Sequence, residues 1–143
     1  MLKNISPILS PELVKTMMEM GHGDEIVLGD CNFPAASLAQ RLIHADGHGI
    51  SALLEAMLTL FPLDHFIECP AALMAVVPGD NVQPTVWETY RQIIRKSGET
   101  FTDFEMMERF AFYERTKKAF AVVATSESAF YGNIILKKGV VKL

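Results

Sequence analysis

Two residues in the first quarter of the chain could do chemistry on a small ligand. His22 lies between two glycines after a predicted helix, where the backbone can approach a ligand closely. Its imidazole can give and take a proton near neutral pH. A histidine is also favoured by the dipole at a helix C-terminus, so a ligand contact and a helix cap remain equal alternatives. Asp30, after the next apolar run, is likewise either a ligand contact or the cap of a loop.

Two later stretches add hydrogen-bonding groups. Arg109 lies beside the apolar side of a predicted helix and is a better candidate for a ligand contact than Glu114, for which an ion pair with Lys117 or Lys118 is expected. Tyr131-Gly132-Asn133 enters a buried strand with a phenol, bare backbone and an amide. Such neutral groups suit an uncharged, polyhydroxylated ligand, although Gly and Asn are also common in turns.

The spacing of His22 and Asp30 limits how they can act together. They flank a predicted strand, Glu25–Leu28, and eight residues at roughly 3.3 Å each separate them by ~26 Å. Either the loop Asp30–Ser37 folds back over the strand, or one of the two residues serves a site shared with another subunit.

The elements that must position these residues alternate between helices and short apolar strands, which predicts a layered α/β fold in a single domain, 1–143. Ser10 is expected to cap the first helix, which should stop at Gly21. The pattern predicts further helices over Ser51–Phe61, Pro84–Arg95 and Asp103–Lys117, and strands over Glu25–Leu28, Leu38–Ala45, Ala71–Val77, Ala119–Ala124 and Ile134–Leu136.

Composition excludes several classes of protein. A net charge of −4 gives no basic surface for nucleic acid or for an anionic membrane. No apolar run approaches the roughly 20 residues that span a bilayer, and the N-terminus lacks a signal-peptide pattern, so a cytoplasmic protein is expected. Cys31 and Cys69 are expected to be free thiols. A hydrophobic content of 50% in a chain of 143 residues mildly favours a homo-oligomer.

The sequence lacks the motifs of several common enzyme and cofactor-binding classes. The sequence has no G-x-G-x-x-G, P-loop, H-E-x-x-H or G-x-S-x-G motif. His44 and His48, with Asp46 between them, could suggest a metal site, but no further ligand lies at a characteristic spacing. A solvated turn is therefore favoured. His65 is expected at the surface, and nothing near Cys31 would clearly activate its thiol as a nucleophile. We therefore expect no metal and no cofactor.

Taken together, the motifs resemble the L-fucose mutarotase family, a branch of a wider group that includes D-ribose pyranase. The resemblance covers essentially the whole chain and is most specific in its last two motifs. It rests on Gly21-His22-Gly23-Asp24, Asp30 with Asn32-Phe33-Pro34, Ala45-Asp46-Gly47, Arg109–Arg115 and Tyr131–Gly139.

This resemblance implies a three-layer α/β/α subunit in rings, typically decameric, with active sites between neighbouring subunits. It implies a cofactor-free interconversion of the α and β anomers of a free monosaccharide. By motif, His22 corresponds to the proton donor, and the sugar-binding positions are Asp30, Arg109, Tyr131, Gly132 and Asn133. Cys31 and His44 depart from the family, which commonly has alanine and arginine there, and either change could alter sugar preference.

The residues fit the reaction that the resemblance implies. Ring opening needs a proton on the ring oxygen and removal of one from the anomeric hydroxyl, and a histidine can serve either step. Asp30 would orient His22 or hold a sugar hydroxyl, and Tyr131 would relay the second proton. Alternative functions are pyranose–furanose interconversion of D-ribose by the same ring opening, non-catalytic sugar binding, and a structural oligomer whose polar cluster only caps loops.

Overall fold

A six-stranded mixed sheet organises the chain, and the computed structural model describes every residue from Met1 to Leu143. The strand order is β2-β5-β1-β6-β3-β4, and β6 runs antiparallel to both of its neighbours, whereas the other pairs are parallel. The helices are α1 (Pro11–Glu19), α2 (Ala35–Leu38), α3 (Ile50–Met57), α4 (Val86–Ser97) and α5 (Arg109–Lys118), and the strands are β1 (Glu25–Gly29), β2 (Leu42–Ala45), β3 (Ala71–Met74), β4 (Glu105–Met107), β5 (Ala121–Thr125) and β6 (Ile134–Lys137).

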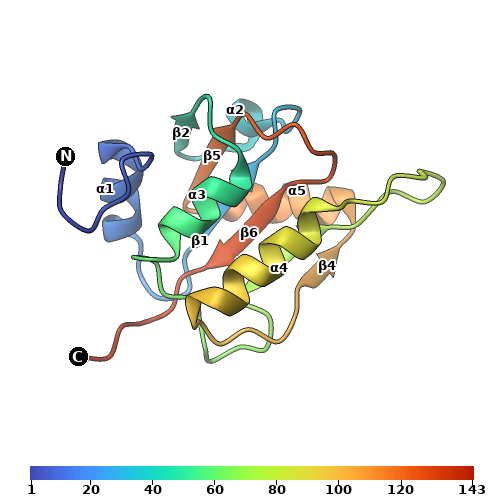
Figure 1. The fold of residues 1–143 in the computed structure, drawn as a ribbon. Coiled ribbons are helices and arrows are strands. Elements are labelled where there is room, and N and C mark those ends of the chain that lie inside the picture. Colours follow the sequence, from blue (N-terminus) through green and yellow to red (C-terminus); the bar gives the residue numbers. More distant parts are fainter.

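Helices cover both faces of this sheet. Figure 1 shows α3 and α4 across the near face, with α2 and α5 behind. Alternate residues of β1 enter different cores: Ile26 and Leu28 pack with α1, α3 and α4, whereas Val27 packs with Phe112 of α5. This alternation is the period-two geometry of a strand that is buried on both faces. The α/β prediction and its three layers are therefore confirmed.

The first helix follows the sequence prediction closely. The Ser10 hydroxyl accepts a hydrogen bond from the backbone N–H of Leu13 at 3.1 Å, and Pro11 occupies the first turn. The helix ends at Glu19, one residue before its cap at Met20, so Gly21 follows it as expected. No helix in the chain is both long enough and apolar enough to cross a membrane.

The predicted helix over 103–117 is wrong in its first half. Residues Glu105–Met107 form β4, a short edge strand that pairs with β3. The Glu108 carboxylate then accepts hydrogen bonds from the N–H groups of Phe110 and Ala111, at 2.9 and 3.0 Å, and so caps α5. Arg109 is thus the first residue of α5, and not an interior one.

The strand predicted over 38–45 is also wrong in its first half. Pro34 leads into a single helical turn, α2, and the strand β2 begins only at Leu42. The predicted loop Asp30–Ser37 therefore contains most of α2. The other predicted elements are present, with ends that differ by a few residues: α3 stops at Met57, β3 stops at Met74, and α4 runs to Ser97.

Candidate active site

A small cavity lies where the end of β1 meets the start of β6. Because these strands are antiparallel, with Leu28 opposite Ile134, the residue that follows β1 lies beside the residue that precedes β6. The cavity has a volume of about 270 Å³. Its lining combines four predicted site residues with aromatic and apolar side chains: Asp30, Asn32, Phe33, Met74, Val77, Asp80, Arg109, Tyr113, Phe130, Tyr131 and Asn133.

Asp30 and Asn133 are locked together. The Asn133 amide oxygen accepts the backbone N–H of Asp30 at 2.7 Å, and the Asp30 carboxylate accepts the N–H of Asn32 at 3.0 Å. Burial raises the pKa of the Asp30 carboxyl, although hydrogen bonds from the N–H groups of Asn32, Gly132 and Phe33 oppose this shift. Asp30 is only 8% exposed. Its carboxylate is held rigidly at the cavity wall, where it can accept hydrogen bonds from ligand hydroxyls.

Tyr131 adopts an unusual backbone conformation at the cavity rim. Its φ of 57° is in the left-handed region, which is uncommon for a side chain other than Asn or Asp. The indole N–H of Trp87 donates to the Tyr131 carbonyl at 2.8 Å, and the Tyr90 hydroxyl donates to the carbonyl of Gly132 at 2.9 Å. These two bonds from α4 hold the loop in place. Tyr131 donates its own hydroxyl hydrogen to Asp80 at 2.6 Å.

Arg109 reaches the same cavity from the first turn of α5. Its Nε donates at 3.2 Å to the hydroxyl of Tyr113, which lies one helical turn further on. The guanidinium also lies 5.4 Å from the ring centroids of both Phe110 and Tyr113. The bond to Tyr113 raises the pKa of Arg109 further, so the group stays cationic.

His22 lies at the far end of β1, away from this cavity. Its Nε2 is 3.2 Å from the buried Asp64 carboxylate, and its ring packs at 5.5 Å from that of Phe66. Burial would raise the pKa of Asp64, but hydrogen bonds from the Phe66 N–H and from His22 outweigh it and lower the pKa. Asp64 thus holds the imidazole in a fixed orientation, while 47% of the His22 side chain remains exposed.

The chain does not fold back to bring His22 and Asp30 together. Asp30 stays at the β1–β6 junction through Asn133, and the next residue, Cys31, donates its N–H to the Glu127 carbonyl at 2.8 Å. Of the two arrangements that the sequence left open, folding back of the loop is therefore wrong.

Sequence reasoning missed several residues of the cavity wall. Asp80 and Tyr113 carry polar groups there, and Phe130 and Met74 supply apolar surface. Asp80 follows Pro78-Gly79, which reads as an ordinary turn, and only the folded structure brings it to Tyr131. Tyr113 lies one helical turn from Arg109, but nothing in the sequence indicated that it faces a cavity.

Other polar groups that the sequence singled out lie outside the cavity. His44 and Asp46 are 3.6 Å apart and both well exposed, as expected for a solvated turn. Glu114 pairs with Lys117 at 2.7 Å, which confirms that prediction. Glu108 caps α5, and Arg115 turns toward other elements.

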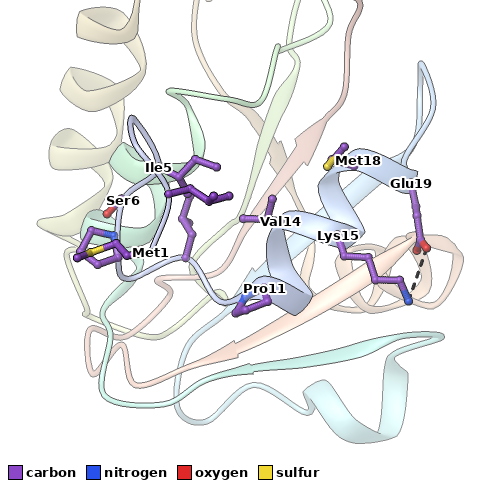
Figure 2. A pocket seen from close by; sticks show the side chains of 11 residues that line it. Met1, Ile5, Ser6, Pro11, Val14, Lys15, Met18 and Glu19 are labelled. Carbon is purple, nitrogen blue, oxygen red and sulfur yellow. Dashed lines mark ion pairs between the residues drawn. The ribbon is translucent and has the colours of Figure 1, made fainter.

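A larger hollow lies at the N-terminal segment and α1 (Figure 2). It has a volume of about 760 Å³ and contains none of the predicted site residues. Figure 2 shows Ile5, Val14 and Met18 around it, with the 3.7 Å ion pair of Lys15 and Glu19 at one edge. An apolar hollow of this kind is a poor match for a polyhydroxylated ligand.

The fold and the small cavity define a protein that binds a small polar molecule where two central strands of a mixed α/β sheet end. The chain belongs to the RbsD / FucU transport protein family, whose sequence model matches residues 3–141.

Among its relatives, a fucose mutarotase of Homo sapiens is 54% identical over 148 residues, covering 99% of this chain and 96% of the relative. An L-fucose mutarotase of Actinobacillus pleuropneumoniae is 53% identical over 140 residues, covering 98% and 97%. The crystal structure of a fucose mutarotase from Streptococcus pneumoniae in complex with L-fucose superposes with a TM-score of 0.91 at 51% identity, covering 99% of this chain and all of that one.

Proposed function

We propose that this protein interconverts the α and β anomers of L-fucose or of a closely related free monosaccharide. One observation carries the proposal: a cavity of about 270 Å³ joins Asp30, Arg109, Tyr131 and Asn133, which come from separate parts of the chain. Carboxylate, guanidinium, phenol and amide groups around aromatic rings match the hydroxyls and the apolar faces of a sugar. A relative that is 51% identical has been crystallised with L-fucose.

The reaction needs two proton transfers and no cofactor. A proton delivered to the ring oxygen and one removed from the anomeric hydroxyl open the ring to an aldehyde. Rotation about the C1–C2 bond and reclosure on the other face give the second anomer. In this reaction Tyr131 takes the proton of the anomeric hydroxyl. Asp30, Asn133 and Arg109 hold the remaining hydroxyls.

His22 of a second copy of this chain supplies the other proton in this proposal. The imidazole is half exposed and is oriented by Asp64, which prepares it for a ligand outside its own chain. An imidazole can give and take a proton near neutral pH, which suits it to this step.

An apolar surface supports assembly with other copies. The hollow in Figure 2 adjoins a second one of about 410 Å³, and the two share Ile5, Val14 and Met18. Met18 is 80% exposed and Val141 is 68% exposed, which is costly unless another chain covers them. A ring of subunits, implied by the family resemblance, and a cytoplasmic location, expected from the composition, complete the proposal.

Saturation-transfer NMR on L-fucose tests the activity. The wild-type protein should exchange the anomers faster than buffer does, and His22→Ala should reduce the rate by about 100-fold or more, the usual worth of general acid–base catalysis. His48→Ala, which removes a histidine outside the cavity, is the matched control and should leave the rate unchanged. Wild-type binding of L-fucose without accelerated exchange would instead identify a non-catalytic sugar-binding protein.

A complementation experiment tests the shared site. His22→Ala and Asn133→Ala chains are each inactive, but co-assembled in equal amounts they restore about one quarter of the sites, because a site then takes His22 and Asn133 from different chains. Mixed assemblies without any recovered activity would refute a site built by two chains. The same exchange measurement on D-ribose separates mutarotation of fucose from pyranose–furanose interconversion.

A further inference from the structure

Asp80 lies in the cavity wall, although nothing in the sequence pointed to it. Its carboxylate makes a short hydrogen bond with the hydroxyl of Tyr131. It lies between β3 and α4, in the segment that projects beyond the start of α4 in Figure 1. The Asp80 N–H donates to the Val77 carbonyl at 3.0 Å, which closes a β-turn. Pro78 is the second residue of this turn, and Gly79, at φ 90°, is the third, as type II requires. The turn places the carboxylate over the Tyr131 ring's hydroxyl end.

The two oxygens of this carboxylate have different partners. Oδ1 accepts the backbone N–H of Val82 at 3.0 Å, and Oδ2 accepts the Tyr131 hydroxyl at 2.6 Å. One oxygen is thus used to fix the side chain, and the other is aimed at the phenol. The bond lowers the pKa of Asp80 and raises the pKa of Tyr131, so the aspartate is the ionised member of the pair.

This bond determines what Tyr131 can offer to a ligand. A phenol has one hydrogen to donate, and here Asp80 takes it. The oxygen also lies 3.4 Å from the N–H of Val77, a long contact that leaves accepting capacity free. A sugar hydroxyl that meets Tyr131 in the cavity must therefore donate to it, which fixes the direction in which the proton moves.

We propose that Asp80 is a positioning residue that makes Tyr131 the proton acceptor for the anomeric hydroxyl and holds the displaced proton while the ring is open. The inference rests on the proposed mutarotase function. Nothing in it depends on which chain supplies His22.

The step balances without any further reactant. The anomeric O1–H proton passes to the Tyr131 oxygen as the phenol's own proton passes to Oδ2 of Asp80. O1 becomes the aldehyde oxygen, and the C1–O5 bond breaks with its electron pair going to O5, which takes a proton from His22. Reclosure reverses each transfer after C1–C2 rotation, so Asp80 and His22 return to their starting states.

The test separates catalysis from binding. Asp80→Asn keeps the size of the side chain but cannot hold the proton, so the exchange rate at saturating L-fucose should fall about 100-fold, the lower end of the general-base range. The dissociation constant should change by less than about threefold, because Asp80 acts through Tyr131. Fluorescence of Trp87, the single tryptophan, reports binding, since its indole is bonded to the Tyr131 carbonyl.

A double-mutant cycle makes the assignment specific. Asp80→Asn should have no further effect on the rate once Tyr131→Phe has removed the hydroxyl. Asp80→Glu should recover part of the lost rate, and the control Asp46→Asn, at an exposed turn elsewhere, should change nothing.

Three results would overturn the proposal. One is an Asp80→Asn defect that persists in the Tyr131→Phe background, as expected of an anchor for the loop. Another is weaker binding of L-fucose with an unchanged exchange rate at saturation, as expected of a direct sugar contact. The third is an unchanged rate. If the wild-type protein does not accelerate anomer exchange, the proposed function is refuted, and the Asp80 proposal with it. This result is obtained before any variant is made, so it is distinguishable from a failure of the Asp80 proposal alone.

Discussion

Removing the Arg115 side chain should cost more stability than removing any exposed charge on the same helix. Arg115 lies in the last turns of α5, and its Nε donates to both carboxylate oxygens of Glu25 at 3.0 Å. The guanidinium also pairs with Glu105 of β4 and contacts the sulfur of Met107. One side chain thus joins the start of β1, the edge strand β4 and the helix that carries Arg109.

The magnitude follows from the burial of the partners. The Arg115 and Glu25 side chains are 21% and 16% exposed, so Arg115→Met would leave a largely buried carboxylate without its counter-ion. Breaking a fully buried pair costs about 3–5 kcal/mol. Because Glu105 is 48% exposed and can be solvated, we expect roughly 2–3 kcal/mol here, near the lower end of that range. For a chain of this length that loss corresponds to a fall in Tm of about 7–10 °C.

Urea unfolding at fixed protein concentration measures this cost, with Lys117→Met as the matched control. Lys117 pairs with Glu114 on the outer face of α5, where both side chains are more than half exposed, so its removal should cost less than about 1 kcal/mol. Adding Glu25→Gln to Arg115→Met should restore part of the stability, because the unpaired charge is then gone. If Arg115→Met costs no more than Lys117→Met, the ion pairs contribute no net stability and the reasoning fails.

Three further changes test local features of the fold. Ser10→Ala removes the cap of α1 and should lower the free energy of unfolding by about 1 kcal/mol in urea. Gly29→Ala would place a Cβ 2.6 Å from Cδ1 of Phe33, so we expect a loss of about 1–3 kcal/mol and weaker sugar binding by tryptophan fluorescence. The lowered pKa of Asp64 stabilises the fold fully above about pH 4 and is lost as the pH falls through the folded value. The stability difference between wild type and Asp64→Asn should therefore shrink as the pH falls below about 4, and a difference independent of pH would exclude this role.

The buried strands could be predicted because their sequences leave little choice. Ile26-Val27-Leu28 and Ala121-Val122-Val123 are continuous apolar runs, as required of strands covered on both faces, and all six residues are buried. The edge strand could not be predicted in this way. Glu105-Met106-Met107 combines good helix formers, and Met106 remains 47% exposed, so only pairing with β3 decides its conformation.

Four residues of the cavity wall could be predicted, but their grouping could not. Asp30 and Asn133 are 103 residues apart, and they meet because β6 runs antiparallel beside β1, a register that no local pattern encodes. Asp80 carried no signal at all, since a Pro-Gly-Asp turn is common on protein surfaces. Its role depends entirely on the loop that brings it to Tyr131.

The position of β1 also limits what any motion of the chain can do. This strand is bonded to β5 on one side and to β6 on the other, and Ile26, Val27 and Leu28 are fully buried between two cores. Such a strand cannot bend or slide without breaking both ladders, so the distance between its two ends is fixed. In the proposed reaction, a His22 that acts beside Asp30 must therefore come from a second chain, and its half-exposed imidazole is already held in place by Asp64.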